Sequence, residues 1–128
     1  MSYHFTTTLD MPFDQAVEHT TKALADKGFG VLTQIDVAAT MKKKLDVDYP
    51  PYLILGACNP KFAHKALQME NKIGTMLPCN VLVQQNEEGK VEVSAVDPAA
   101  SMQAIDNTGL GDIASEVRGM LQDMINGL

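Results

Sequence analysis

The two cysteines, Cys58 and Cys79, are the residues of this chain best suited to chemistry, because a thiol can act as nucleophile, redox partner or metal ligand. Cys58 ends an apolar stretch and directly precedes Asn59-Pro60, a pair typical of a helix start. Backbone N–H groups at a helix start favour negative charge, and Lys61 adds a cation in the first turn. The pattern therefore predicts either a reactive, ligand-orienting thiol at Cys58 or a buried apolar one that closes the turn.

Cys79 follows Leu77-Pro78 and opens a second apolar stretch, which by itself is typical of a packing residue. A redox disulfide with Cys58 requires Cα atoms within about 7 Å of each other, and the intervening chain permits this without requiring it. No Cys-x-x-Cys motif is present, so thioredoxin-like chemistry is not indicated. His64 opens one alternative, a Cys2His metal site, although none of the usual zinc spacings occurs.

Common catalytic motifs are absent: there is no glycine-rich dinucleotide or phosphate loop, no nucleophile elbow and no paired-carboxylate motif. We therefore lean toward a non-enzyme without cofactor or metal, with Cys58 and Cys79 as weak catalytic candidates. One hypothesis is a module that binds a small molecule or an anion. Its predicted site consists of Cys58, Asn59, Lys61, His64, Pro78 and Cys79.

Two other functions remain open from the sequence. The first is a thiol-based redox enzyme or sensor, in which Cys58 attacks and Cys79 resolves the mixed disulfide. The second is a structural or partner-binding dimer without a small-molecule site. A run of three lysines, Lys42 to Lys44, is either a solvated helix face or an anion-binding patch in an otherwise acidic protein.

Composition excludes several classes of function. The 128 residues fit one domain, 1–128, and 45% hydrophobic with 20% charged residues is ordinary globular composition. A net charge of −6 does not suit a nucleic-acid binder, which needs a basic face. No apolar run is long enough to span a membrane, and the first residues do not resemble a secretory signal. Two cysteines without such a signal predict a cytoplasmic protein with reduced thiols.

Hydrophobic periodicity predicts alternating strands and helices. The strands are expected at Tyr3–Leu9, Phe29–Ile35, Tyr52–Ala57, Cys79–Gln84 and Val91–Val96. Helices are expected between Pro12 and Gly28, over Val37–Leu45, after Asn59-Pro60 and over Asp112–Ile125. Asp97-Pro98 should cap a short turn, and Asn107-Thr108-Gly109 should break the chain.

This order of elements predicts an α+β domain with helices on one face of a sheet. The last two strands should form an antiparallel hairpin, whereas helical crossovers leave parallel pairing open for the others. The strands carry more apolar residues than one helical layer obviously needs, so the other face requires a cover, which a partner subunit could supply. Several methionines, Met69, Met76, Met102, Met120 and Met124, are expected in the core, in a dimer seam or along an apolar pocket.

The segment GACNPKFAHKAL, followed by MLPCNVLV, resembles the domain of unknown function 302 family of small bacterial and archaeal proteins. The resemblance covers nearly the whole chain. It implies a helix-backed, largely antiparallel five-stranded sheet similar to the TATA-box-binding-protein fold, and it implies a homodimer. The family carries no established activity, so the resemblance transfers no catalytic residue, and the acidic chain argues against DNA binding.

Overall fold

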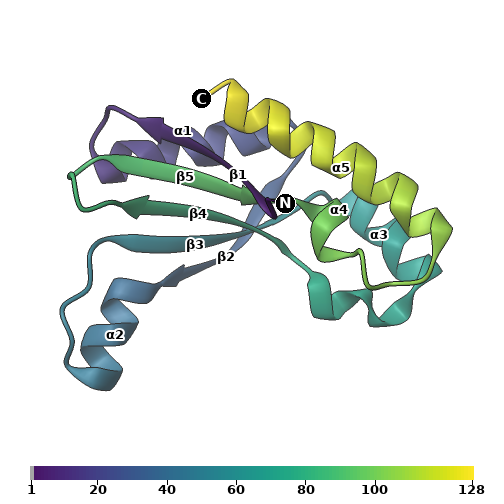
Figure 1. Ribbon diagram of the computed structural model, residues 1–128, viewed down its shortest axis with the longest axis horizontal. Coiled ribbons are helices and arrows are strands. Elements are labelled where there is room, and N and C mark those ends of the chain that lie inside the picture. Colours follow the sequence, from purple (N-terminus) through teal and green to yellow (C-terminus); the bar gives the residue numbers. More distant parts are fainter. Residues whose placement is uncertain (1) are drawn as a thin grey trace.

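The computed structural model describes residues 2–128 as an α+β domain built on one sheet (Figure 1). Its elements are β1 (His4–Leu9), α1 (Phe13–Asp26), β2 (Gly30–Asp36), α2 (Val37–Leu45), β3 (Tyr52–Cys58), α3 (Pro60–Met69), the 3-10 helix η1 (Asn71–Met76), β4 (Cys79–Gln85), β5 (Val91–Val96), α4 (Pro98–Ser101) and α5 (Thr108–Asn126). Within the described residues, no helix has both the length and the apolar character needed to cross a bilayer.

The sheet has the strand order β1-β5-β4-β3-β2, and every neighbouring pair is antiparallel. The parallel pairing that the sequence left open does not occur. The reason is that α1 carries the chain from one edge strand, β1, to the opposite edge strand, β2, and the later strands then fill the space between them in turn. The edge strand β2 is irregular, because its register against β3 shifts between Val31 and Thr33.

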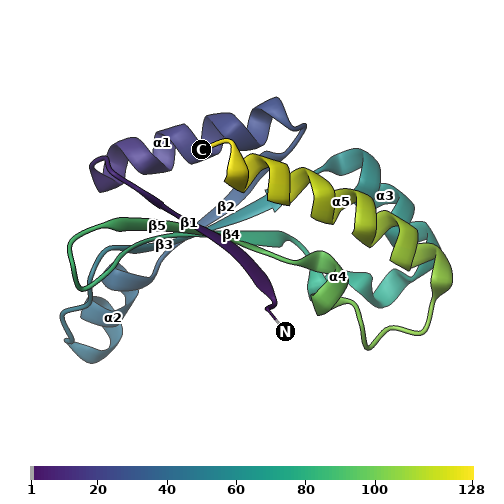
Figure 2. The same cartoon turned by 45° about the horizontal axis from the view of Figure 1, so that its top comes forward.

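Helices α1 and α5 both lie on one face of this sheet, as Figure 2 shows. Strand residues alternate between the two faces, and the set that points toward the helices is fully or almost fully buried. Examples are Val81 and Val93 on the strands, which pack in one core with Leu24 of α1 and Leu121 of α5. Burial of each such side chain contributes roughly 1.5–3 kcal/mol, so this face supplies most of the stability.

Two elements in the second half of the chain differ from the sequence-based expectation. Helix α5 begins at Thr108 rather than Asp112, because the side chain of Asn107 accepts a hydrogen bond from Gly109 N at 3.2 Å and so starts the helix. The triplet expected to break the chain is thus a helix start. The 3-10 helix η1 was not expected, and Glu70 begins it by accepting from Lys72 N at 3.1 Å.

Asp97 caps α4, as its sequence context predicted, and also binds α5. Its Oδ1 accepts hydrogen bonds from Ala99 N at 3.0 Å and Ala100 N at 3.4 Å. Its Oδ2 accepts from Arg118 Nε at 3.0 Å, and the guanidinium of Arg118 also lies 5.1 Å from the centre of the Phe5 ring. Only 7% of the surface of Asp97 is exposed, so its carboxylate oxygens obtain their hydrogen bonds from these partners instead of from bulk water.

Replacement of Arg118 by Leu should therefore destabilise the protein more than loss of a surface ion pair would. The variant keeps part of the apolar contact with Phe5 but leaves the Asp97 carboxylate without its cation, which we expect to cost about 2 kcal/mol. Urea unfolding followed by circular dichroism measures this. Glu116→Ala, an exposed change on the same helix, is the matched control and should alter stability little. If Arg118→Leu lowers the free energy of unfolding no more than Glu116→Ala does, the ion pair does not have the stabilising role described here.

Candidate functional site

The strand-to-helix joint after β3 has the form that the sequence predicted. Strand β3 ends at Cys58, Asn59 is the residue before the helix, and Pro60 occupies the first helical position. The Asn59 side chain, however, does not cap the helix. Its Nδ2 donates to Met120 Sδ at 3.9 Å and lies against Gly28, where an added Cβ would come within 3.3 Å of it. Asn59 therefore connects the joint with α5 and with the turn after α1 through side-chain contacts.

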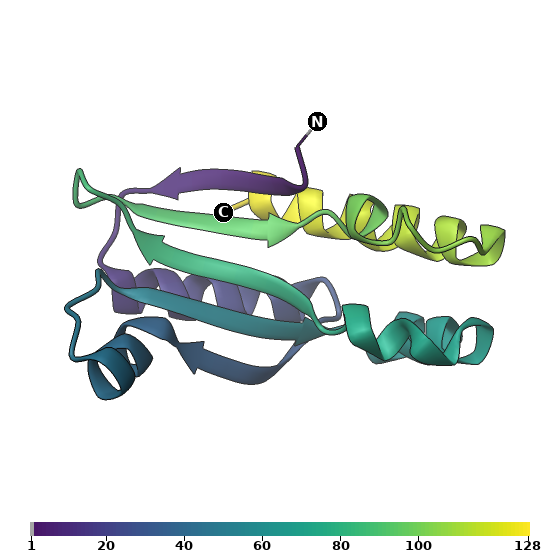
Figure 3. The same ribbon diagram turned by 60° about the horizontal axis from the view of Figure 1, so that its bottom comes forward.

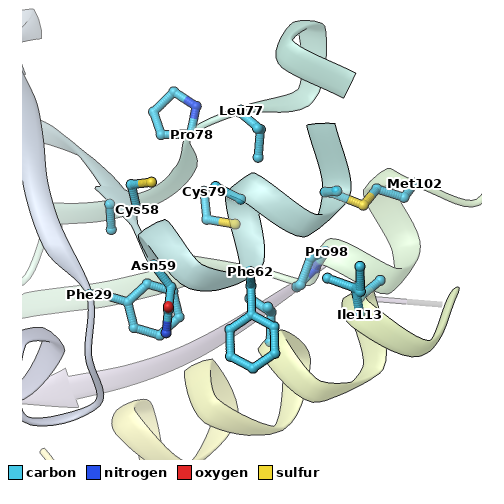
Figure 4. A pocket seen from close by; sticks show the side chains of 15 residues that line it. Phe29, Cys58, Asn59, Phe62, Leu77, Pro78, Cys79, Pro98, Met102 and Ile113 are labelled. Carbon is cyan, nitrogen blue, oxygen red and sulfur yellow. The ribbon is translucent and has the colours of Figure 1, made fainter. Parts of the chain in front are cut away.

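A partly open cavity of about 40 Å³ lies beside this joint, bordered by the ends of β3 and β4 and by α3, α4 and α5 (Figure 4). In Figure 4 the Cys79 side chain lies between Cys58 on one side and Met102 on the other. Its lining is almost entirely apolar. The residues are Phe29, Ala57, Cys58, Asn59, Phe62, Ala63, Ala66, Leu77, Pro78, Cys79, Pro98, Met102, Ile113, Ala114 and Val117.

The size of the cavity limits what enters it. A volume of about 40 Å³ corresponds to roughly three water-sized spheres. A dry apolar cavity that holds benzene is several-fold larger, about 150 Å³. Water gains little in a site with so few polar partners, so the cavity as built suits an uncharged group of a few heavy atoms.

The structure brings together four of the six residues predicted for the site. Cys58, Asn59, Pro78 and Cys79 line the cavity, whereas Lys61 and His64 are exposed on α3 and do not line it. Among residues 2–128 there is no group of three or more His, Cys, Asp or Glu side chains that could hold a metal ion. The Cys2His arrangement considered from the sequence therefore does not form.

The far wall of the cavity was missed by reasoning from the sequence. Pro98, Met102, Ile113 and Val117 come from α4 and α5, which are distant in the chain from the cysteines. Of these four residues, the sequence pointed only to Met102, as one of the methionines expected in the core, in a dimer seam or along an apolar pocket. Pro98 belongs to the short turn that the sequence predicts, and Ile113 and Val117 belong to the predicted last helix, but no local pattern connects them with the joint after β3.

Gly56 keeps the cavity's near side compact. A Cβ at this position would overlap the Thr33 hydroxyl and would approach Pro78 Cγ to 2.8 Å. Glycine is therefore required for β2 to lie close to β3 and for Pro78, which follows a cis peptide bond, to reach the cavity wall. The cavity beside Cys58 therefore depends on glycine at position 56.

The two thiols are both free, and they have different surroundings. Cys58 is half-buried, whereas only 8% of the Cys79 surface is exposed. Burial raises the pKa of the Cys79 thiol from 9.0 to about 11, and the neighbouring Cys58 adds to the shift through charge repulsion. At neutral pH only about one Cys79 in ten thousand is a thiolate, so Cys79 behaves as an apolar wall residue.

The fold and this joint define a class, an α+β domain with an open helix-backed sheet and an apolar cavity at one strand end. Comparison with known proteins extends this to a family. The family described as "Domain of unknown function DUF302" matches residues 5–128, and the chain therefore belongs to the DUF302 family. A crystal structure of an uncharacterized conserved protein DUF302 from Bacillus stearothermophilus has a TM-score of 0.91 and 26% sequence identity over 98% of each chain. No curated protein matches.

The raised pKa of Cys79 predicts a specific loss of stability at alkaline pH. Because the folded-state pKa, about 11, exceeds the unfolded value of 9.0, the stabilisation is complete below pH 9 and is lost as the pH rises toward 11. Relative to Cys79→Ala, the wild-type free energy of unfolding should fall by about 2 kcal/mol between pH 9 and pH 11.

Urea unfolding at a series of pH values measures this difference, and subtraction of the variant removes the contribution of tyrosines and lysines. Cys58→Ala serves as the matched control: it should retain most of the slope due to Cys79, because burial is the larger cause of the raised pKa and only the smaller contribution of Cys58 is removed. Parallel curves for wild type and Cys79→Ala between pH 9 and 11 would contradict a buried thiol.

Proposed function

We propose that this DUF302 domain binds a small uncharged molecule by inserting one of its apolar groups into the cavity beside Cys58. The observation that carries the proposal is the cavity itself: it is built almost wholly from apolar side chains, yet the thiol of Cys58 and the amide of Asn59 lie at its wall. Sites of this kind obtain affinity from apolar contact and orientation from a few polar groups.

The surroundings favour an uncharged ligand over an anion. Lys61, the cation expected to attract an anion to the helix start, is exposed and does not line the cavity. The chain also has a net charge of −6, which repels anions at long range. The sequence predicted a site for either a small molecule or an anion, and these features support an uncharged small molecule.

Xenon is a suitable probe, because it occupies small apolar cavities without needing polar contacts. We expect xenon to shift the methyl signals of Ala57, Ala66 and Ala114 in NMR spectra of the wild-type protein. Ala66→Leu should abolish these shifts by filling the cavity, whereas Ala104→Leu, an exposed control, should not. Unchanged methyl signals in the wild type would remove the basis of the proposal. Native mass spectrometry of freshly purified protein then identifies any retained ligand by mass.

A second proposal concerns the homodimer, and a specific feature of α2 supports it. Helix α2 buries none of its residues and extends away from α1 and α5 (Figure 1). Around it the chain exposes large apolar side chains, with Leu32 at 67% and Ile35 at 51%, and with Leu45 and Val47 also exposed. These four residues form what we call the β2–α2 patch. Exposed apolar side chains gathered beside a helix without a fully buried residue are typical of an interface.

The charge of this region supports a second copy of the chain as the partner of the β2–α2 patch. Between residues 36 and 48 there are three lysines and three aspartates, so the region is neutral although the whole chain is not. Lys42, one of the three lysines in the run, pairs with Asp46 at 3.1 Å and with Asp48 at 3.2 Å. Two copies of an acidic chain repel each other less across such a neutral region than across the rest of their surfaces.

The dimer proposal predicts a mass close to twice 13.9 kDa in light scattering coupled to size exclusion. Ile35→Lys introduces a charge into the β2–α2 patch and should shift the protein to the mass of a single chain. Leu67→Lys alters an exposed apolar residue on α3, outside the patch, and should leave the dimer intact. The proposal is overturned if the wild-type protein has the mass of a single chain at micromolar concentration.

The thiol-redox alternative has less support. A resolving cysteine has to reach the thiolate form, and burial of Cys79 opposes this at neutral pH. The two free thiols agree with the proposed cytoplasmic location, where reducing conditions prevail.

A further inference from the structure

The face of the sheet opposite α1 and α5 carries a hollow that none of the preceding proposals uses. Figure 3 shows this face, with β3, β4, β5 and β1 in front of the helices. The hollow has a volume of about 540 Å³, within the roughly 300–1,000 Å³ typical of small-molecule sites. Eight of its 11 lining residues carry polar groups, and apolar atoms between them form the larger part of its surface. The residues are Tyr3, His4, Thr6, Tyr52, Asn80, Leu82, Gln84, Glu92, Ser94, Ala95 and Val96.

Strand register arranges these side chains in three rows across the sheet. One row contains Tyr52, Gln84 and Glu92, which face each other across β3, β4 and β5. The next contains Leu82, Ser94 and Thr6, and the third is formed by Asn80 with the pair Val96 and His4. With neighbouring strands about 4.8 Å apart and same-face residues about 7 Å apart, the three rows cover roughly 14 by 14 Å.

Hydrogen bonds hold the polar groups of the hollow in place before any ligand arrives. His4 Nδ1 and Thr6 Oγ1 are 2.7 Å apart, and Thr6 Oγ1 and Ser94 Oγ are 2.8 Å apart, so the three side chains form a chain across β1 and β5. At the other corner, Asn86 Nδ2 donates to Glu92 Oε2 at 3.0 Å and leaves Oε1 available. Side chains held in this way lose little entropy when a ligand binds.

The chemistry of the hollow indicates the class of ligand. Hydroxyl and amide groups both donate and accept hydrogen bonds, which matches a neutral molecule rich in hydroxyl groups. No lysine or arginine lines the hollow, so it lacks the cations that phosphate or carboxylate ligands require. Tyr52 offers an aromatic ring whose position is supported by Tyr49, 5.9 Å away in an edge-to-face arrangement.

We propose that this hollow binds a neutral carbohydrate of one or two sugar rings. The hydroxyl groups of the sugar contact the His4–Thr6–Ser94 chain and the amides of Asn80 and Gln84, while an apolar ring face packs on Tyr52. The area of about 14 by 14 Å accommodates two rings and excludes a long chain lying across the sheet. None of these residues belongs to the β2–α2 patch or to the cavity beside Cys58.

The test is a titration of the full-length ¹⁵N-labelled protein with glucose, N-acetylglucosamine, maltose and cellobiose, followed by NMR. At least one sugar should cause saturable shifts in the amides of residues 80–84 and 92–96. Thr6→Val should weaken that binding by about fivefold or more, the effect of one lost hydrogen bond. Ser94→Ala should act in the same direction.

Thr8→Val is the matched control, because Thr8 lies on the same strand and on the same face as Thr6 but outside the hollow. It should leave sugar affinity unchanged, and both valines suit a strand, so folding is preserved. The proposal is overturned if no sugar causes saturable shifts, if Thr6→Val and Thr8→Val have equal effects, or if inorganic phosphate shifts the same amides more strongly. It is also overturned if Thr6→Val turns a dimer into a monomer, because the hollow would then be covered by a second copy.

Discussion

The carboxylate of Asp97 joins the sheet to the helices that enclose the cavity. It lies at the end of β5, accepts two backbone hydrogen bonds from α4 and binds Arg118 of α5. Pro98, the next residue, and Val117, the residue before Arg118, are both wall residues of the cavity. The positions of these two walls therefore depend on one buried charge whose hydrogen bonds are satisfied on both oxygens.

The sheet gives its two faces different chemistry. Residues facing α1 and α5 are apolar and buried, and they form the core that ends at the cavity beside Cys58. Residues one position away along each strand face the other way and are mainly polar and partly exposed. A single antiparallel sheet thus has the apolar cavity on one side and the hollow on the other, and no side chain lines both.

Local patterns predicted the strands and the joint at Cys58 well, because alternation, prolines and turn residues act over a few positions. Two features required long-range information. The strand order follows from α1 passing between opposite edges of the sheet, which no local signal specifies. The cavity walls from α4 and α5 meet the cysteines only after the chain has packed. Asn107 is ambiguous for another reason: an asparagine with a glycine two residues later suits both a chain break and a helix start.

The register shift in β2 has a consequence for how copies of this protein can meet. An edge strand presents unpaired backbone groups, and a regular edge invites further strands to add without limit. The irregularity between Val31 and Thr33 interrupts that row of donors and acceptors and increases the local twist. Growth of fibrils from this edge is thereby disfavoured, even though apolar side chains such as Leu32 remain uncovered beside it.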